Sequence, residues 1–181
     1  ENSFIRKNID YVKFRTMNEQ TNVAITLTEE DAKQRVEKAV ELFKQGYNCS
    51  QSVVAAFADL YGYTTEQALR MAASFGGGIG RMRQTCGAAC GMFLLAGLDC
   101  GATDGADRVG KSHNYAVVQQ LADAFKNING SIICAELLGL SKPNHNPQAE
   151  ERTATYYKKR PCAEMVRTGA QLFADYLLKQ Q

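Results

Sequence analysis

The residues of this chain best suited to chemistry are six cysteines, at positions 49, 86, 90, 100, 134 and 162. A chain of 181 residues buries enough apolar surface to fold without disulfides, so stability alone does not require them. The simplest interpretation of any one cysteine is a small buried apolar residue. The positions of the six relative to the predicted helices favour a chemical role for four of them.

Four cysteines closely follow residues that typically begin helices: Cys49 after Asn48, Cys86 after Thr85, Cys134 after Ser131, and Cys162 after Pro161. A helix N-terminus carries about half a positive charge and unpaired N–H donors. It favours a thiolate over a thiol and lowers the cysteine pKa from about 8.5 toward neutrality. The thiolate attacks disulfides and binds metals, so we expect these four cysteines to meet at one site.

The segment Cys86-Gly87-Ala88-Ala89-Cys90-Gly91 is the sharpest local pattern. Gly87 and Gly91 lie one helical turn apart, and glycine inside a helix costs about 1 kcal/mol relative to alanine. We therefore expect another backbone or a cofactor to approach this face closely. Cys90 lies one turn from Cys86, as a resolving thiol or a second ligand, so Gly87, Gly91 and Cys90 are candidate cofactor-binding residues.

The sequence lacks the motifs of several common cysteine sites and of a nucleotide site. It has no Cys-x-x-Cys, the pattern typical of thioredoxin-type sites, zinc ribbons and c-type haem attachment. The glycine-rich stretch 76–80 lacks the Gly-Lys-Ser/Thr of a phosphate loop, so neither haem nor a nucleotide is expected. The sequence is compatible with an iron–sulfur cluster, because the cysteine ligands of a cluster can come from separate helices.

The net charge of +2 gives no global field for nucleic acid, and no apolar run approaches the roughly 20 residues of a membrane helix. We expect a cytoplasmic protein with a redox partner that the sequence does not identify. The apolar face of the last predicted helix is either core or the seam of a homodimer.

Helical periodicity predicts an all-α fold, a compact bundle of six or seven helices with a Gly-rich loop. We expect an N-terminal extension at 1–27, with Met17 a candidate start of the native chain, and a single helical domain at 28–181. The segment 141–160 is expected to be an extended loop. The Gly-rich loop is expected to pack near the cysteines, where Arg81, Arg83 and the run 158–160 either add positive charge or are simply solvated.

Three elements together resemble the C_GCAxxG_C_C family of redox-active proteins: Gly46-Tyr47-Asn48-Cys49-Ser50-Gln51, the core Cys86-Gly87-Ala88-x-x-Gly91, and single cysteines at 134 and 162. The resemblance spans about residues 32–177. It implies that Cys49, Cys86, Cys134 and Cys162 are the family's cysteines, while Cys90 and Cys100 are incidental. A related domain occurs in split-Soret cytochromes with haem and an iron–sulfur centre, of which only the latter carries over here.

Two versions of a redox function follow for the four cysteines. In one they ligate a [2Fe–2S] or related cluster, or another thiolate-bound metal; in the other they cycle between dithiol and disulfide. The metal version is slightly favoured, because four gathered thiolates repel one another without a cation. Whether the protein is an oxidoreductase or an electron carrier stays open. The alternative is a non-catalytic helical domain that binds a metal or a partner and has structural cysteines.

Overall fold

A computed structural model of the chain describes residues 25–142 and 145–180. The expected extension lies outside the described residues up to position 24, Met17 included. The described residues are all-α, as expected. They form the α-helices α1 (Glu29–Lys44), α2 (Cys49–Phe57), α3 (Thr65–Ala72), α4 (Gly87–Cys100), α5 (Arg108–Asn129), α6 (Cys134–Leu137), α7 (Ala154–Lys159) and α8 (Cys162–Leu178), with 3₁₀ turns at Ala58–Tyr61 and Ala73–Phe75.

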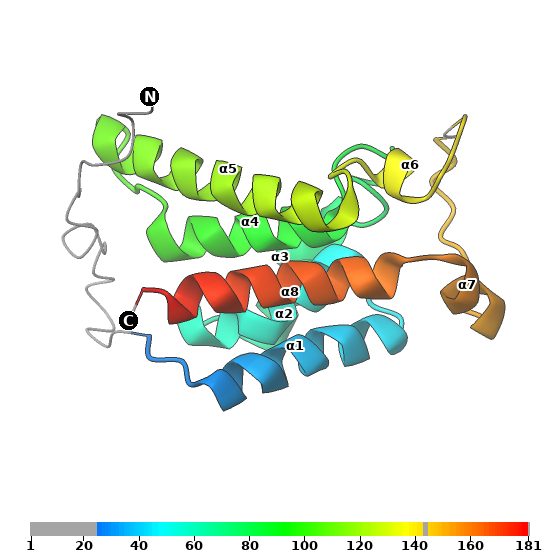
Figure 1. The fold of residues 1–181 in the computed structure, drawn as a ribbon, viewed down its shortest axis with the longest axis horizontal. Coiled ribbons are helices and arrows are strands. Elements are labelled where there is room, and N and C mark those ends of the chain that lie inside the picture. The colour runs from blue at the N-terminus through cyan, green and yellow to red at the C-terminus, as the bar shows by residue number, and fades with distance from the viewer. Residues whose placement is uncertain (1–24, 143–144, 181) are drawn as a thin grey trace, which may run out of the picture.

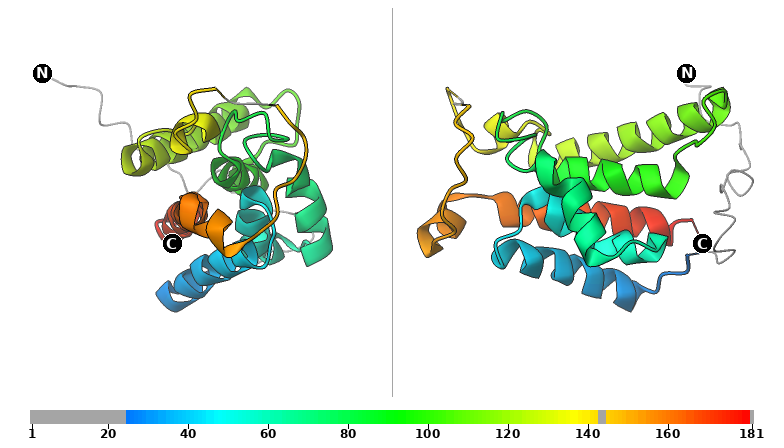
Figure 2. Two further views of the ribbon diagram at one scale, coloured as in Figure 1. Left: turned by 90° about the vertical axis from the view of Figure 1, so that its right-hand side faces the viewer. Right: turned by 180° about the vertical axis from the view of Figure 1, so that it is seen from behind.

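Five helices, α1, α2, α4, α5 and α8, run side by side as a bundle (Figure 1). Helices α2, α4 and α8 all begin at the same end of the bundle, where α6 and α7 also lie, whereas α1 and α5 run the opposite way (Figures 1 and 2). Helix α8 packs against α1, α2, α4 and α5. The fold therefore gathers several helix N-termini at one end.

Local capping fixes where the helices begin. Thr28, Asn48 and Thr64 each accept a hydrogen bond from a backbone N–H in the first turn and close a capping box. At α2, the Asn48 side chain accepts from the Gln51 N–H at 2.9 Å, and the Gln51 side chain accepts in return from the Asn48 N–H at 3.1 Å. This reciprocal pair holds Cys49 as the first residue of α2.

The core lies where α2, α4 and α8 meet. The rings of Phe57 and Phe173 pack edge to face with centroids 5.3 Å apart, and Met92 and Leu95 of α4 are fully buried beside them. Burial on this scale makes the bundle a rigid support for the residues at its end. None of the helices in the described part of the chain has the length and apolar character to cross a membrane.

The segment 141–160 is not loop throughout, because the short helix α7 forms inside it. The Thr153 hydroxyl accepts from the Tyr156 N–H at 3.2 Å, and the Tyr157 hydroxyl donates to the carbonyls of Phe43 and Lys44 at the end of α1. Contacts with α1, which no sequence periodicity announces, thus hold α7 against the bundle.

Candidate functional site: a pocket of four cysteines

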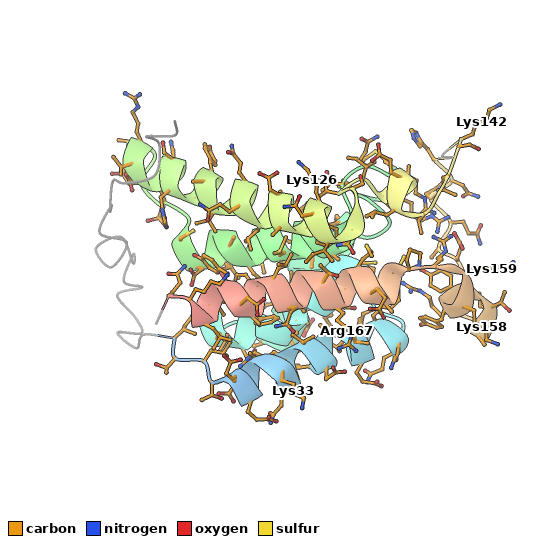
Figure 3. All side chains as sticks on the ribbon, in the orientation of Figure 1. Lys33, Lys126, Lys142, Lys158, Lys159 and Arg167 are labelled. Carbon is orange, nitrogen blue, oxygen red and sulfur yellow. The ribbon has the colours of Figure 1, made fainter. Side chains whose placement is uncertain are left out.

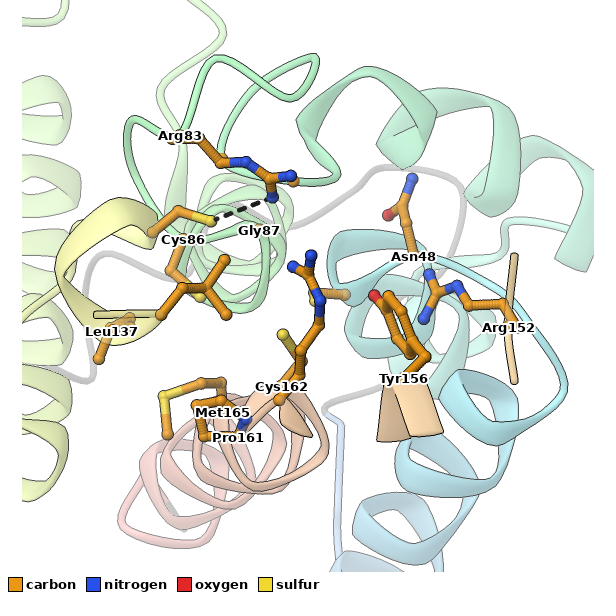
Figure 4. Close-up of a pocket in the computed structure, with 16 residues that line it drawn as sticks. Asn48, Arg83, Cys86, Gly87, Leu137, Arg152, Tyr156, Pro161, Cys162 and Met165 are labelled. Carbon is orange, nitrogen blue, oxygen red and sulfur yellow. Dashed lines mark hydrogen bonds between the residues drawn. The ribbon is translucent and has the colours of Figure 1, made fainter. Parts of the chain in front are cut away.

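One pocket at the gathered end of the bundle is lined by Cys49, Cys86, Cys134 and Cys162, and we call it the cysteine pocket (Figure 4). Each of the four stands at a helix start: Cys49, Cys134 and Cys162 are the first residues of α2, α6 and α8, and Cys86 is the N-cap of α4. Residues far apart along the chain thus meet in one place. All six cysteines are free thiols.

Cys49 and Cys162 form the first pair, because their side chains are hydrogen-bonded to each other. Cys162 is partly exposed, and Cys49 is buried. The hydrogen bond from Cys49, helped by the positive charges of Arg160, Arg152 and Arg83, lowers the pKa of Cys162 to about 7. The same hydrogen bond, together with burial, raises the pKa of Cys49 well above its ordinary value. At neutral pH about half of the Cys162 side chains are therefore thiolate, while Cys49 stays a thiol.

Cys86 and Cys134 form the second pair, which backbone hydrogen bonds hold together. The Cys86 N–H donates to the Ile132 carbonyl at 2.7 Å, and the Cys134 N–H donates to the Gln84 carbonyl at 2.6 Å, on either side of an isolated bridge between Thr85 and Ile133. The start of α4 and the start of α6 are thereby tied to each other.

Burial decides the protonation of the second pair. It raises the pKa of Cys86 to about 12, although the N–H groups of Ala88 and Ala89 at the start of α4 donate to its sulfur. Burial also raises the pKa of Cys134, against the nearby Arg83 guanidinium. The expectation that helix N-termini lower the pKa of all four thiols is therefore wrong for three of them: at Cys49, Cys86 and Cys134, effects led by burial or by the partner thiol outweigh the helix terminus.

Three arginines, Arg83, Arg152 and Arg160, line the cysteine pocket. Arg83 is only 6% exposed, and its Nη1 lies 4.0 Å from the Cys134 sulfur (dashed in Figure 4). Glu150 forms ion pairs with Arg160 at 2.6 Å, with Arg81 at 3.2 Å and with Arg83 at 3.5 Å. The pocket is thus a cationic environment in which a thiolate is stabilised without a metal.

The basic run before Cys162 divides into two parts. Arg160 lines the pocket and lowers the pKa of Cys162. Lys158 and Lys159 extend from α7 at the periphery of the molecule (Figure 3). One of the three charges expected near Cys162 therefore acts on it directly.

The Gly-rich loop packs against the cysteines, as expected. A Cβ atom added to Gly78 would lie 2.5 Å from the Cys134 Cβ. Gly87, the first residue of α4, is also closely packed: a Cβ atom there would lie 2.8 Å from the Phe75 carbonyl oxygen and 3.3 Å from the Cys49 Cβ. Arg83 leaves this loop with a φ of 61°, a conformation that costs about 1 kcal/mol or more for a non-glycine residue. This strained backbone conformation places the Arg83 side chain beside Cys134.

Two residues predicted to bind a cofactor, Gly91 and Cys90, do not line the pocket, and neither does Cys100. A Cβ on Gly91 would lie 3.0 Å from both the Ser50 carbonyl oxygen and the Val53 Cβ, so the backbone of α2 is what approaches this face. The Cys90 sulfur lies 3.8 Å from the Thr85 carbonyl oxygen. Cys100 stands at the other end of α4, where its sulfur accepts from the Asn114 side chain at 3.3 Å.

The donors of the described residues are not arranged around a single metal ion. Within residues 25–142 and 145–180, no group of three or more histidine, cysteine or acidic side chains is placed to hold one metal ion. The four cysteines of the pocket are instead arranged as two pairs. A [2Fe–2S] cluster needs two protein ligands on each iron, whereas a single tetrahedral ion needs all four donors around one point.

Comparison with known proteins identifies the family of the chain. No curated protein and no solved structure matches the chain. The sequence model of the family described as "Putative redox-active protein (C_GCAxxG_C_C)" matches residues 47–176, a stretch that contains all four cysteines of the pocket, α2 to α7 and most of α8. The resemblance expected from the sequence is confirmed: this chain belongs to the C_GCAxxG_C_C family of redox-active proteins.

Proposed function

We propose that this chain is a thiol–disulfide redox protein in which Cys162 is the attacking thiolate and Cys49 is the resolving thiol. The observation that carries the proposal is the pocket that Cys162 shares with Cys49 and three arginines. The side-chain interaction with Cys49 and the positive charges of the arginines lower the pKa of Cys162 to about 7. A thiol with a pKa near the ambient pH is the best attacking group, because it is ionised and still nucleophilic. Cys162 is also the most exposed of the six cysteines, so it is the one that a substrate reaches first.

The reaction needs a disulfide substrate, RS–SR, as its oxidant. The Cys162 thiolate attacks one substrate sulfur, the substrate S–S bond breaks, and the first RS⁻ leaves with the bonding electron pair and takes up a proton from solvent. The Cys49 thiol then gives its proton to the second leaving group as its sulfur attacks the Cys162 sulfur. The protein ends as a Cys49–Cys162 disulfide, and the substrate is reduced to two thiols.

The arginines support the first step. Arg160, Arg152 and Arg83 each stabilise the negative charge on Cys162, and they lose part of that interaction when the mixed disulfide forms. Tyr156 carries two of these guanidiniums over its ring, with Arg152 and Arg160 at 4.6 and 4.9 Å from the ring centre. The cationic pocket thus holds the reduced protein ready to react at neutral pH.

A second candidate function, electron transfer by a [2Fe–2S] cluster, is favoured by the arrangement of the cysteines in two pairs. Cys49 with Cys162 and Cys86 with Cys134 would hold it, and the cluster would supply one-electron chemistry. The chain's own residues would provide four thiolates, with the pocket arginines offsetting their charge. Metal binding would also release the protons that burial keeps on Cys86 and Cys134.

One preparation separates the candidates. Anaerobically purified protein is analysed for iron, zinc and acid-labile sulfide, its visible spectrum is recorded, and its native thiols are titrated. The disulfide proposal predicts a colourless, metal-free protein that reduces an added disulfide and acquires a Cys49–Cys162 bond, mapped by differential alkylation and mass spectrometry. A Cys100→Ala variant, altered at the far end of α4, should behave as the parent does.

Other results would overturn the disulfide proposal. About two irons and two sulfides per chain with visible absorption would replace it with the cluster. Metal-free protein whose six thiols react only after denaturation would replace both with a domain whose cysteines are structural.

A further inference from the structure

Arg152 is held in the cysteine pocket in an unusual way. Its guanidinium lies between two rings, 4.8 Å from the centre of Phe43 and 4.6 Å from the centre of Tyr156. Its Nη2 donates to the Tyr47 carbonyl oxygen at 3.4 Å, while its Nη1 is buried and has no hydrogen-bond partner. An unpaired buried donor costs about 1–3 kcal/mol, and more when the group is charged. The two rings hold the guanidinium in place despite this cost.

The ion pairs of the pocket leave Arg152 without a carboxylate partner. Glu150 pairs with Arg81, Arg83 and Arg160, and no carboxylate in the described part of the chain pairs with Arg152. Figure 4 shows the Arg152 side chain entering the pocket beside the Tyr156 ring. A guanidinium that lines the pocket of Cys49 and Cys162 and has no carboxylate partner is suited to an anion.

The size of the pocket limits what that anion is. The cavity measures about 40 Å³, and a single water needs roughly 10–15 Å³ by the same measure. Such a space admits one small group, such as a carboxylate, and excludes the broad surface of a folded protein. The planar fork of a guanidinium matches the two oxygens of a carboxylate.

We propose that Arg152 binds the carboxylate of a small acidic disulfide substrate and so positions the substrate sulfur against Cys162. The proposal rests on the thiol–disulfide function and adds the substrate class: low-molecular-weight disulfides that carry a carboxylate a few bonds from sulfur.

The test uses two alkylating reagents that differ only in the group Arg152 would bind. Iodoacetate and iodoacetamide both transfer a two-carbon unit: the bond from the Cys162 sulfur to carbon forms, the carbon–iodine bond breaks, and iodide leaves with the electron pair. The first carries a carboxylate and the second a neutral amide. Mass spectrometry of the Cys162 peptide gives the rate constant for each, and their ratio measures the preference for the anion.

We expect Arg152→Gln to lower the iodoacetate-to-iodoacetamide ratio about ten-fold, the effect of losing one charge-assisted hydrogen bond. Both reagents need the same thiolate, so any change in Cys162 ionisation cancels in the ratio. Lys159→Gln removes one positive charge three positions from Cys162 and is the matched control, with less than about a two-fold change expected. Arg152→Lys keeps the charge without the fork and should give an intermediate ratio.

The parent protein also gives a result that needs no variant. Its ratio should exceed that of a small neutral thiol such as 2-mercaptoethanol by about ten-fold. An equal ratio in both, or a ratio unchanged by Arg152→Gln while Cys162 still reacts with iodoacetamide, would overturn the anion site and leave the redox function standing. Native protein in which neither reagent alkylates Cys162 would overturn both.

Discussion

Replacing Cys49 by alanine removes the thiol that donates to Cys162, and this change tests the proposed mechanism most directly. The hydrogen bond from Cys49 is the largest of the effects that lower the pKa of Cys162 from 9.0 to about 7. At pH 7 about half of the Cys162 side chains are thiolate, compared with about 1% for a pKa of 9.0. If the whole shift were lost, the thiolate population would fall about 50-fold.

The expected change in rate is smaller, because a more basic thiolate is a better nucleophile. With a Brønsted slope of 0.4–0.5, a rise of two units in the thiol pKa increases the reactivity of each thiolate about eight-fold. The net loss of reaction rate at pH 7 is then about six-fold. The arginines remain in the variant, so part of the shift persists and the loss lies between about two- and six-fold. The midpoint of the pH–rate profile should move upward from about 7.

The assay is stopped-flow reaction with the neutral disulfide 2,2′-dithiodipyridine between about pH 5 and 10, with a Cys162→Ala variant to measure the other thiols. Cys49→Ser is the matched control, because its hydroxyl still donates while it cannot resolve a mixed disulfide. The serine variant should keep the low midpoint, and the alanine variant should lose it. An unchanged midpoint in Cys49→Ala, or equal upward shifts in both variants, would refute the hydrogen bond as the source of Cys162 reactivity.

Three further predictions concern the support of the site. Gly91→Ala should lower the free energy of unfolding by about 1–3 kcal/mol in urea titrations, because its Cβ would press on α2; Gly97→Ala in the same helix meets open space and should raise it by up to about 1 kcal/mol. Above pH 9 the unfolded chain loses the Cys86 proton before the folded chain does, since the folded pKa is raised to about 12. The free energy of unfolding should therefore fall by up to about 1.4 kcal/mol per pH unit for this thiol, and a Cys86→Ala variant with an equally steep decline would contradict the assignment. Asp99 accepts from two tyrosine hydroxyls at 3.0 and 2.7 Å, so Asp99→Ala should destabilise by about 2–4 kcal/mol, while Asp123→Ala, which breaks an exposed ion pair, should cost below about 0.5 kcal/mol.

The sequence predicts the helix starts because their signals are local. Asn48 and Gln51 stand three residues apart and form a capping box wherever the chain around them is helical. Pro161 before Cys162 likewise predicts the start of α8. These signals place each cysteine of the pocket at the start of a helix before any tertiary contact is known.

The cationic side of the pocket could not be predicted in the same way. Arg152 lies in a segment without periodicity, and it reaches the pocket because the rings of Phe43 and Tyr156, more than 100 positions apart along the chain, close on it. The pKa values of the pocket cysteines could not be predicted from the sequence for a similar reason. A helix start is visible in sequence, whereas the burial that outweighs it at Cys86 depends on the packing of the whole bundle.

The first cysteine pair joins α2 to α8, and its members stand 113 positions apart along the chain. A covalent link across so long a loop removes about 4.7 kcal/mol of freedom from the unfolded chain. By thermodynamic linkage, the native fold should favour the bond by the same amount, which lowers its reduction potential by about 100 mV relative to the unfolded polypeptide. Oxidation would then brace the bundle, and any opening of α8 from its neighbours would make the bond easier to break by reductants.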